Sequence, residues 1–371
     1  MKFIIKKNIL FDALVNTSKA ISQKNLIPIL TGIKFDLKKD GLYLYASDSD
    51  ISIRSYIPKE DIIEIIETGS VVIGGKYIVE IVRKLPDADI VIEVLDGYNM
   101  IVSTKGTEFN LNGINPSEFP NLSFDESKNP IVISPIVFKN IINQTSFATS
   151  MSETRPLLTG INLKLKENNL EVIATDSYRL AKKNIKLDEK YENDFDIVIP
   201  SKNLMELVKI ADDDKEKIYF HVFSNKVLFK YKNILFLSRL ISGTYPVSSD
   251  IIPKDFSVVV SVKYDELFNM IDRASLLTSD RDKNIIRLEL GNNELIISSN
   301  SPEIGKVEEK TTVDTDSEIA ISFSSKFMLD AIKSFNTEDI EICMNNDNSP
   351  IIIRNNKDES LIQLVLPIKT Y

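Results

Sequence analysis

Residues 174–183, with the sequence ATDSYRLAKK, bring together side chains that could carry out acid–base chemistry. Tyr178 and Lys182 stand four residues apart, the spacing at which some reductases use a lysine to lower the pKa of a tyrosine. That chemistry needs both residues on one turn of a helix, beside a dinucleotide site. Asp176 and Ser177, however, follow an alternating apolar segment, a pattern that predicts a strand leading into a turn. The stretch is therefore either a catalytic centre or a polar turn with another purpose.

Other common chemistries lack their residues in this chain. One histidine, His221, and one cysteine, Cys343, cannot supply a usual zinc site, a pair of histidines for acid–base work or an intrachain disulfide. The sequence has neither a G-x-x-x-x-G-K-[ST] loop nor a G-x-G-x-x-G motif after a strand. The acidic run at 211–217 is typical of a solvated turn rather than of a cation site. We expect no catalytic residue, no bound metal and no cofactor.

The length and charge of the chain limit its class. A chain of 371 residues is long enough for two or three domains, and its 43% hydrophobic and 27% charged residues are ordinary for a globular protein. No apolar run approaches the roughly 20 residues of a membrane span. Charged residues near the start and the single cysteine predict a mature N-terminus and a cytoplasmic protein. The formal charge of −9 argues against coating nucleic acid through a bulk positive field but allows a local basic surface.

The chain repeats itself three times, at offsets close to one third of its length. A segment with a lysine in second place and apolar residues at helical spacing occurs as GKYIVEIVR (75–83), SKNLMELVK (201–209) and SKFMLDAIK (325–333). A second amphipathic helix is predicted upstream of each copy, with apolar stripes that begin at Leu10, Phe138 and Leu267. A third set, expected to form a shared turn after a strand, lies at 46–51, 174–179 and 298–303.

These patterns predict the fold class and the domain boundaries. Each third of the chain has two amphipathic helices and several alternating strands, so we predict an α+β chain of three tandem repeats, each with two helices packed on antiparallel sheet. The connections carry matched aromatic–proline pairs, Phe119-Pro120 and Tyr245-Pro246, 126 residues apart. We place the domains at residues 1–124, 125–252 and 253–371.

The second helix of every repeat carries two cations seven residues apart, which places both on one helical face. These pairs are Lys76 and Arg83, Lys202 and Lys209, and Lys326 and Lys333. Each could be an ordinary solvated helix face. Their recurrence in three diverged repeats of an acidic chain also fits a surface that faces phosphates without reading sequence.

The combination of these features resembles the family of bacterial sliding clamps, the beta subunits of DNA polymerase III. The resemblance covers nearly the whole chain, through the start MKF, LIPIL at 26–30, ATDSYRLA at 174–181, the aromatic–proline joints and the end LVLPIKTY at 364–371. It implies a ring of two subunits joined head to tail, with helices lining a central hole and sheets on the outside. Such a ring is a processivity factor that encircles double-stranded DNA, in the cytoplasm at the nucleoid, and performs no chemistry.

The resemblance also implies residues for two interfaces. Beside the helix cations, Lys24 and Arg155 lie where the family contacts DNA. The head-to-tail dimer joint is expected to bring Phe109 and Leu111 of one subunit to Leu276 and Leu277 of the other. From the sequence alone, these four residues could equally be internal core.

The third implied site is a hydrophobic cleft between the second and third domains. In the family it takes short peptides with Gln and Leu or Phe from the replicative polymerase alpha subunit, the clamp loader, repair polymerases and mismatch-repair proteins. Carried over by position, its residues are Leu158, Thr175, Ser177, Tyr178, Arg179, Leu180, Pro246, Ile251, Leu364, Leu366, Pro367, Ile368 and Lys369. Apolar members would anchor the peptide and Arg179 would fix its direction. Ser177-Tyr178 replaces the commoner Gly-His and Asp250 replaces a frequent basic residue, which puts the peptide preference in doubt.

Two other functions remain open at this point. A non-catalytic repeat scaffold without a DNA role would have no need of the three basic helix faces. A reductase using Tyr178 and Lys182 would need a helix and a glycine-rich phosphate loop. The C-terminal run could also be no more than an apolar strand with a frayed end.

Overall fold

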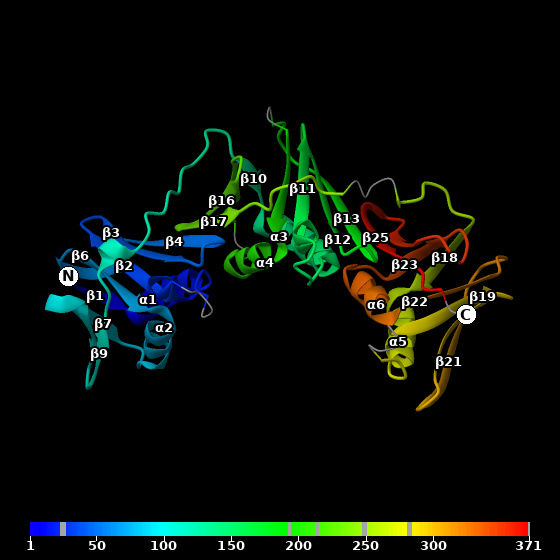
Figure 1. Ribbon diagram of the computed structural model, residues 1–371, viewed down its shortest axis with the longest axis horizontal. Coiled ribbons are helices and arrows are strands. Elements are labelled where there is room, and N and C mark those ends of the chain that lie inside the picture. The colour runs from blue at the N-terminus through cyan, green and yellow to red at the C-terminus, as the bar shows by residue number, and fades with distance from the viewer. Residues whose placement is uncertain (23–26, 192–193, 213–214, 247–250, 280–283, 370–371) are drawn as a thin grey trace. The chain divides into compact units, whose positions relative to one another are not determined.

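The computed structural model describes residues 1–22, 27–191, 194–212, 215–246, 251–279 and 284–369 (Figure 1).

Each repeat has the same order of elements: a strand, a helix, several strands, a second helix and three strands. The first repeat contains β1 (Lys2–Lys6), α1 (Lys7–Ser18), β2 (Gly32–Lys38), β3 (Gly41–Ser47), β4 (Ile51–Pro58), β5 (Ile62–Glu67), β6 (Gly69–Gly74), α2 (Gly75–Lys84), β7 (Asp89–Val94), β8 (Asn99–Thr104) and β9 (Thr107–Asn112). The second contains β10 (Ile131–Ile133), α3 (Pro135–Thr145), β11 (Gly160–Lys166), β12 (Asn169–Thr175), β13 (Arg179–Lys186), β14 (Phe195–Pro200), α4 (Ser201–Ile210), β15 (Ile218–Val222), β16 (Lys226–Tyr231) and β17 (Ile234–Arg239). The third contains β18 (Val258–Lys263), α5 (Tyr264–Ser275), β19 (Ile285–Gly291), β20 (Glu294–Ser301), β21 (Gly305–Thr312), β22 (Ile319–Ser324), α6 (Ser325–Lys333), β23 (Asp339–Met344), β24 (Ile351–Asn355) and β25 (Asp358–Val365). The threefold α+β repeat is confirmed.

The strands form four antiparallel sheets, and the two eight-stranded ones cross the boundaries between repeats. Their orders are β5-β1-β7-β8-β9, β10-β15-β16-β17-β4-β3-β2-β6, β14-β11-β12-β13-β25-β24-β23-β18 and β21-β20-β19-β22. In the first eight-stranded sheet, β17 of the second repeat pairs with β4 of the first. In the other, β25 of the third repeat pairs with β13 of the second. We call these two pairings the internal joints.

The chain forms two compact units that differ from the three repeats. The first unit is residues 1–138 with 203–240, and the second is residues 139–202 with 241–371. Each unit contains one of the eight-stranded sheets. Because each of these sheets takes half of its strands from the second repeat, that repeat is divided between the two units.

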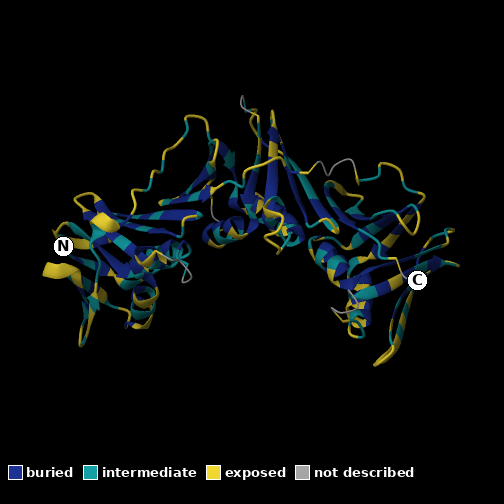
Figure 2. Cartoon of the chain, in the orientation of Figure 1, coloured by how far each residue is buried: buried dark blue, intermediate teal, exposed yellow. Residues whose placement is uncertain are grey.

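The helices have the boundaries and buried stripes that their periodicity predicts. α2, α4 and α6 begin at the first residue of the three repeated segments. In α5 the buried residues Leu267, Met270, Ile271 and Ala274 follow the predicted i, i+3, i+4, i+7 spacing. In Figure 2 the helices accordingly carry both dark-blue buried and yellow exposed residues.

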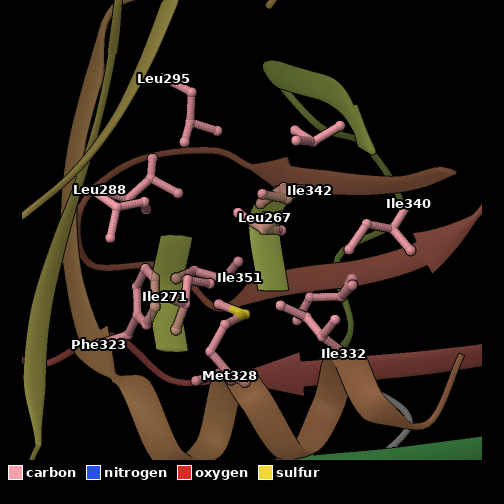
Figure 3. Packing of buried hydrophobic residues seen from close by; sticks show 14 of the residues in the cluster. Leu267, Ile271, Leu288, Leu295, Phe323, Met328, Ile332, Ile340, Ile342 and Ile351 are labelled. Atoms are coloured by element: carbon pink, nitrogen blue, oxygen red, sulfur yellow. The ribbon is translucent and has the colours of Figure 1, made fainter. Parts of the chain in front are cut away.

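The core of the third repeat shows how the sheet positions a second helix. Leu267 and Ile271 of α5 meet Met328 and Ile332 of α6 in one buried cluster with Phe323 of β22 (Figure 3). Truncating one such side chain to alanine costs about 2–5 kcal/mol of stability. This packing fixes which face of α6 is buried and leaves its other face to the functional residues.

Candidate functional site

The opening stretch is a polar turn between β12 and β13. The Asp176 carboxylate Oδ1 accepts hydrogen bonds from the backbone N–H groups of Tyr178 (2.9 Å) and Arg179 (3.0 Å). The Thr175 hydroxyl donates to the Arg179 carbonyl at 2.6 Å and accepts from the Ser177 N–H at 3.1 Å. Ser177 has φ 79°, a conformation that glycine adopts without steric cost. The side chains of Thr175 and Asp176 thus form hydrogen bonds with the backbone groups of the turn, as in an Asx turn.

The first repeat contains the same turn, but the third does not. Asp48 Oδ1 accepts from the N–H groups of Asp50 at 3.0 Å and Ile51 at 2.9 Å, and Ser49 has φ 80°. In the third repeat, residues 298–301 stay in strand β20 and pair with residues 305–308 of β21. The prediction of a turn shared by all three copies is therefore wrong for the third, because its hairpin turns later.

The geometry for a tyrosine–lysine dyad is missing. Lys182 lies within strand β13, where its backbone pairs with Ile173 and Ile362. Its Nζ forms an ion pair with the Glu171 carboxylate at 2.5 Å. Tyr178, in the preceding turn, is 65% exposed. The two side chains do not share a helical turn, so this position lacks the arrangement that the reductase reading requires.

Arg179 is held by four side chains and is only 10% exposed. Its Nε lies 3.1 Å from Asp176 Oδ2, and its Nη1 lies 2.6 Å from Asp330 Oδ2 on α6. The guanidinium also covers the rings of Phe147 and Phe327, at 5.4 and 4.5 Å from their centroids. These contacts tie the turn of the second repeat to the second helix of the third. No local sequence pattern indicates Asp330 or Phe327 as partners of Arg179, because both lie about 150 residues away along the chain.

The apolar residues expected in the cleft meet in one cluster of the second unit. Leu158, Leu180 and Leu364 are 5%, 1% and 1% exposed and pack together with Tyr245, while Leu366 packs against this cluster. The Tyr245 hydroxyl accepts the backbone N–H of Thr175 at 3.1 Å, and Thr175 is itself buried. Burial raises the pKa of the Tyr245 hydroxyl, which therefore stays neutral. Leu158, Leu180 and Leu364 thus form a buried base rather than an open surface.

Other members of the expected cleft are accessible. Pro246 and Lys369 are exposed, Ile251 is 48% exposed, and Pro367 and Ile368 are half-buried. The Tyr178 ring lies 6.5 Å from that of Phe327 at an interplanar angle of 24°. Asp250 lies outside the described residues.

The C-terminal tail is held to both of its neighbours. The Leu366 N–H donates to the Tyr178 carbonyl at 2.9 Å, and the Ile368 N–H donates to the Ser322 carbonyl at 2.7 Å. These bonds place Pro367 beside the turn. Through Ile368 the tail is therefore an anchored segment and not a frayed end.

The cations of the second helices are all exposed, as their pattern predicts. They are Lys76, Arg83, Lys202, Lys209, Lys326 and Lys333. Arg83 pairs with Glu80, and Lys209 pairs with Glu206 at 2.6 Å, each across one helical turn. Exposed pairs of this kind are worth about 0.3–0.5 kcal/mol, so they leave the cations available to a stronger anion.

Two further basic residues were expected near DNA. Arg155 is exposed, and its Nη1 donates to the Ser177 hydroxyl at 3.2 Å, which links it to the polar turn. Lys24 lies outside the described residues.

The four residues expected at the dimer joint lie at or near two sheet edges. Phe109 and Leu111 are on the edge strand β9, and Phe109 is 37% exposed. Leu276 and Leu277 follow α5, which packs on β20 and on the edge strand β21. Leu276 is 75% exposed and Leu277 is half-buried. The alternative that all four are internal core is wrong for Phe109 and Leu276.

Two absences hold for the described part of the chain. None of its helices combines the length and the apolar character needed to cross a membrane. Within the same residues, no group of three or more His, Cys, Asp or Glu side chains is arranged to hold a metal ion.

The chain matches known proteins along its full length. It matches the N-terminal, central and C-terminal domain families of the DNA polymerase III beta subunit at residues 1–123, 132–247 and 249–369. It is 44% identical to the beta sliding clamp of Bacillus subtilis and 41% identical to that of Staphylococcus aureus, with 100% of each chain covered. The crystal structure of the DNA polymerase sliding clamp from Bacillus subtilis superposes with a TM-score of 0.97, again over 100% of both chains.

Proposed function

The chain belongs to the beta subunit family of DNA polymerase III, and we propose that this sliding clamp acts as a head-to-tail ring of two subunits around double-stranded DNA. The ring tethers the replicative polymerase and performs no chemistry itself. Three tandem domains per subunit, with boundaries near residues 124 and 252, give six domains in the ring. We place it in the cytoplasm, on the nucleoid.

The observation that carries the ring is the pattern of the internal joints. By position in the repeat, β9 is the counterpart of β17 and β25, and β21 is the counterpart of β4 and β13. Both internal joints pair the first kind of strand with the second. Within the described sheets, β9 and β21 are edge strands with one neighbour each. Joining β9 of one subunit to β21 of another repeats the internal joint, and two such contacts close a ring.

Burial at the equivalent positions supports the same joint. Phe109 corresponds to Phe236 and Gln363, which are 1% and 0% exposed at the internal joints, whereas Phe109 is 37% exposed. Ile53 and Ala181, the partners of Phe236 and Gln363 across the internal joints, are also fully buried.

The register of the internal joints can be carried over to the proposed contact. In the hairpin of β20 and β21, Val307 occupies the position that Ala181 has in the hairpin of β12 and β13. Ala181 pairs with Gln363, the counterpart of Phe109, so in this register Phe109 lies opposite Val307 of the partner subunit. Leu276 and Leu277 follow Ala274 at the end of α5, which packs on the strand that holds Val307. Their exposed apolar surface would be covered by the same contact.

The distribution of charge suits encirclement rather than tight binding. The chain has a formal charge of −9, while each repeat presents two exposed cations on its second helix. Modest phosphate contacts without base readout allow movement along the duplex. Arg155 and Lys24 would add to this surface.

The apolar cluster of the second unit is proposed as the docking site for partner peptides. Tyr178, Ile251 and the tail from Leu366 to Lys369 offer an accessible surface over a buried base. Peptides with Gln and Leu or Phe, from the polymerase alpha subunit, the clamp loader, repair polymerases and mismatch-repair proteins, are the expected occupants. Arg179, held by Asp176 and Asp330, would position the turn rather than grip the peptide by itself.

A loading assay tests the proposal. The protein is loaded onto nicked circular DNA with a clamp loader and ATP, and the circle is then cut to a linear form. A ring that encircles DNA is retained on the circle and lost after cutting. Retention on linear DNA would indicate ordinary DNA binding, and failure to load would favour a scaffold without a DNA role.

A further inference from the structure

The first unit contains a cavity of about 370 Å³ that none of the proposed roles uses. It lies on the face of β2 and β3 opposite the buried core side, where Phe35 and Leu44 are 0% exposed. Lys34 and Tyr45 line it from the sheet, and Phe119 lines it from the connection after β9. The cavity is therefore open to a ligand without disturbing the helices.

The sheet next to this cavity carries cations without counter-ions. Lys34, Tyr45 and Arg54 are direct cross-strand neighbours on β2, β3 and β4. The ion pairs of the described residues include none for Lys34 or Arg54. The Arg54 guanidinium lies 5.8 Å from the Tyr43 ring and 5.7 Å from the Phe124 ring, and its buried Nε has no hydrogen-bond partner. Arg54 does not line the cavity itself, but its charge lies on the strand next to Tyr45 and adds to the positive potential beside Lys34.

The second repeat neutralises the equivalent positions, 128 residues later. Lys182, the counterpart of Arg54, pairs with Glu171 at 2.5 Å. Glu171 itself stands at the place of Tyr43. Asn162, the counterpart of Lys34, donates a hydrogen bond to Asp196 at 2.6 Å. Cations without an ion pair at the positions of Lys34 and Arg54 are therefore not required by the fold.

The other wall of the cavity mixes apolar residues with the polar Ser117 and Asn121. Phe119 is buried in a cluster with Ile29, Leu30 and Val72, against which Tyr45 and Leu122 pack. Lys34 Nζ lies 5.9 Å from the centre of the Phe119 ring, so cation and apolar surface are adjacent. This combination suits an apolar side chain followed closely by a carboxylate.

A nucleic acid strand fits the site less well than a peptide. Asp36 lines the cavity, and Glu118 is exposed on the same connection. Lys38, the remaining lining cation, is already paired with Asp36 at 3.4 Å. A chain of phosphates would meet these carboxylates, whereas a single acidic side chain can reach Lys34 alone.

We propose that this cavity is a second docking site, for a short peptide of a partner protein that carries an acidic side chain beside an apolar one. The site goes beyond the proposed clamp function, and it stands or falls independently of ring formation and of the peptide site in the second unit. A partner bound here would leave the second unit available to another.

Fluorescence polarisation with three labelled hexapeptides tests the proposal on the full chain. The probes are GDLFDG, its uncharged match GNLFNG and its basic match GKLFKG. We expect GDLFDG to bind at least about five-fold more tightly than GNLFNG, which is roughly one charge-assisted contact. Hydrogen exchange should slow at residues 34–45 and 116–122 when GDLFDG binds. Lys34→Gln should weaken this binding about five-fold, while Lys39→Gln, an exposed lysine in the next turn, should leave it unchanged.

Several results would overturn the proposal. Equal binding of GDLFDG and GNLFNG would remove the role of charge, and this comparison holds even if Lys34→Gln proves unstable. Protection confined to residues 175–180 and the C-terminal tail would place the peptide at the second-unit site. Protection of residues 34–45 by a 15-nucleotide oligo(dT), but not by GDLFDG, would reassign the cavity to single-stranded DNA.

Discussion

Truncating Phe109 or Leu276 should open the proposed dimer without unfolding the subunit. Phe109 is 37% exposed, which leaves about 75 Å² of a ~200 Å² side chain to be buried, worth about 2 kcal/mol. Leu276 is 75% exposed, which leaves about 100 Å² of a ~140 Å² side chain to be buried, worth about 2.5 kcal/mol before the methyl group that alanine retains is subtracted. A closed ring has two joints, so either substitution, at about 2 kcal/mol for each joint, should raise the dimer Kd several hundred-fold.

Sedimentation velocity from nanomolar to micromolar concentration measures both effects. Ile66→Ala is the matched control, because Ile66 is 50% exposed on β5, the opposite edge of the same sheet. Thermal unfolding should be nearly unchanged for Leu276→Ala, which removes mostly exposed surface, and modestly lowered but still cooperative for Phe109→Ala and Ile66→Ala, whose side chains are 37% and 50% exposed. The proposed pairing of β9 with β21 of a second subunit is wrong if Phe109→Ala and Leu276→Ala dimerise as tightly as Ile66→Ala. It is also wrong if the unmodified protein is monomeric at micromolar concentration.

The register can be tested in the same dimer. The double variant Phe109→Cys, Val307→Cys should form intersubunit disulfides on mild oxidation, because directly opposed residues in antiparallel strands are about 4.5–5.5 Å apart at Cα. Cys343 is buried, and burial raises the pKa of its thiol to about 11, so it should not compete. Moving the second cysteine to Glu309→Cys shifts the pair by two residues and should abolish cross-linking. Efficient cross-linking of that shifted pair would contradict the register.

Three further predictions concern the second unit, the tail and pH. Deleting residues 367–371 should leave the unfolding temperature and DNA loading nearly unchanged while abolishing binding of a polymerase-derived peptide, measured by calorimetry. Unchanged peptide affinity would refute the tail's role. Arg179→Gln should lower the free energy of unfolding, measured in urea, by about 2–3 kcal/mol, because it leaves the partly exposed Asp330 carboxylate without its partner. Asp330→Asn should lower it by less. Burial lowers the pKa of His221, whose Nδ1 accepts the Ser127 N–H at 2.8 Å, so the unfolded state binds the proton more tightly. Stability should therefore fall as pH drops below about 6.5, and His221→Gln should reduce that fall; an identical pH profile in the variant would exclude His221.

The sequence predicted the features that depend on local periodicity. The repeated segments gave the start of α2, α4 and α6, and the apolar stripe of α5 is buried as expected. The turn at Asp176 was also predictable, because its hydrogen bonds join residues at most three apart. A helical stripe or an Asx turn is decided within a few residues, so its signal is present in the sequence of that segment.

The strand partners and the contacts of Arg179 could not be predicted, because they join residues far apart along the chain. Alternation in β4 and β13 identifies strands but not their partners, so it does not indicate that the sheets are shared between repeats. Nothing near Arg179 indicates that Asp330 and Phe327 hold it, since α6 reaches it only through the pairing of β25 with β13. The turn of the third repeat was misplaced for a related reason: residues 298–301 keep pairing with β21, and that pairing outweighs the local turn signal.

One kind of joint, present at two places in the chain and proposed at a third between subunits, relates the different surfaces of the chain. Between β17 and β4 the turn is followed by buried Ile51, and the charged cavity lies on the adjoining strands. Between β25 and β13 the same position is Arg179, whose ion pairs hold the turn and leave Tyr178 exposed beside the tail. At β9 and β21 the joint is unmade within one chain, and its apolar residues remain accessible to a second copy. Because the backbone pairing is common to both internal joints, the side chains around it account for the difference between the proposed peptide site at one and the cavity beside Lys34 at the other. The same reasoning explains why substitutions at Tyr178 should alter partner binding without weakening the joint, since only its backbone carbonyl takes part in holding the tail.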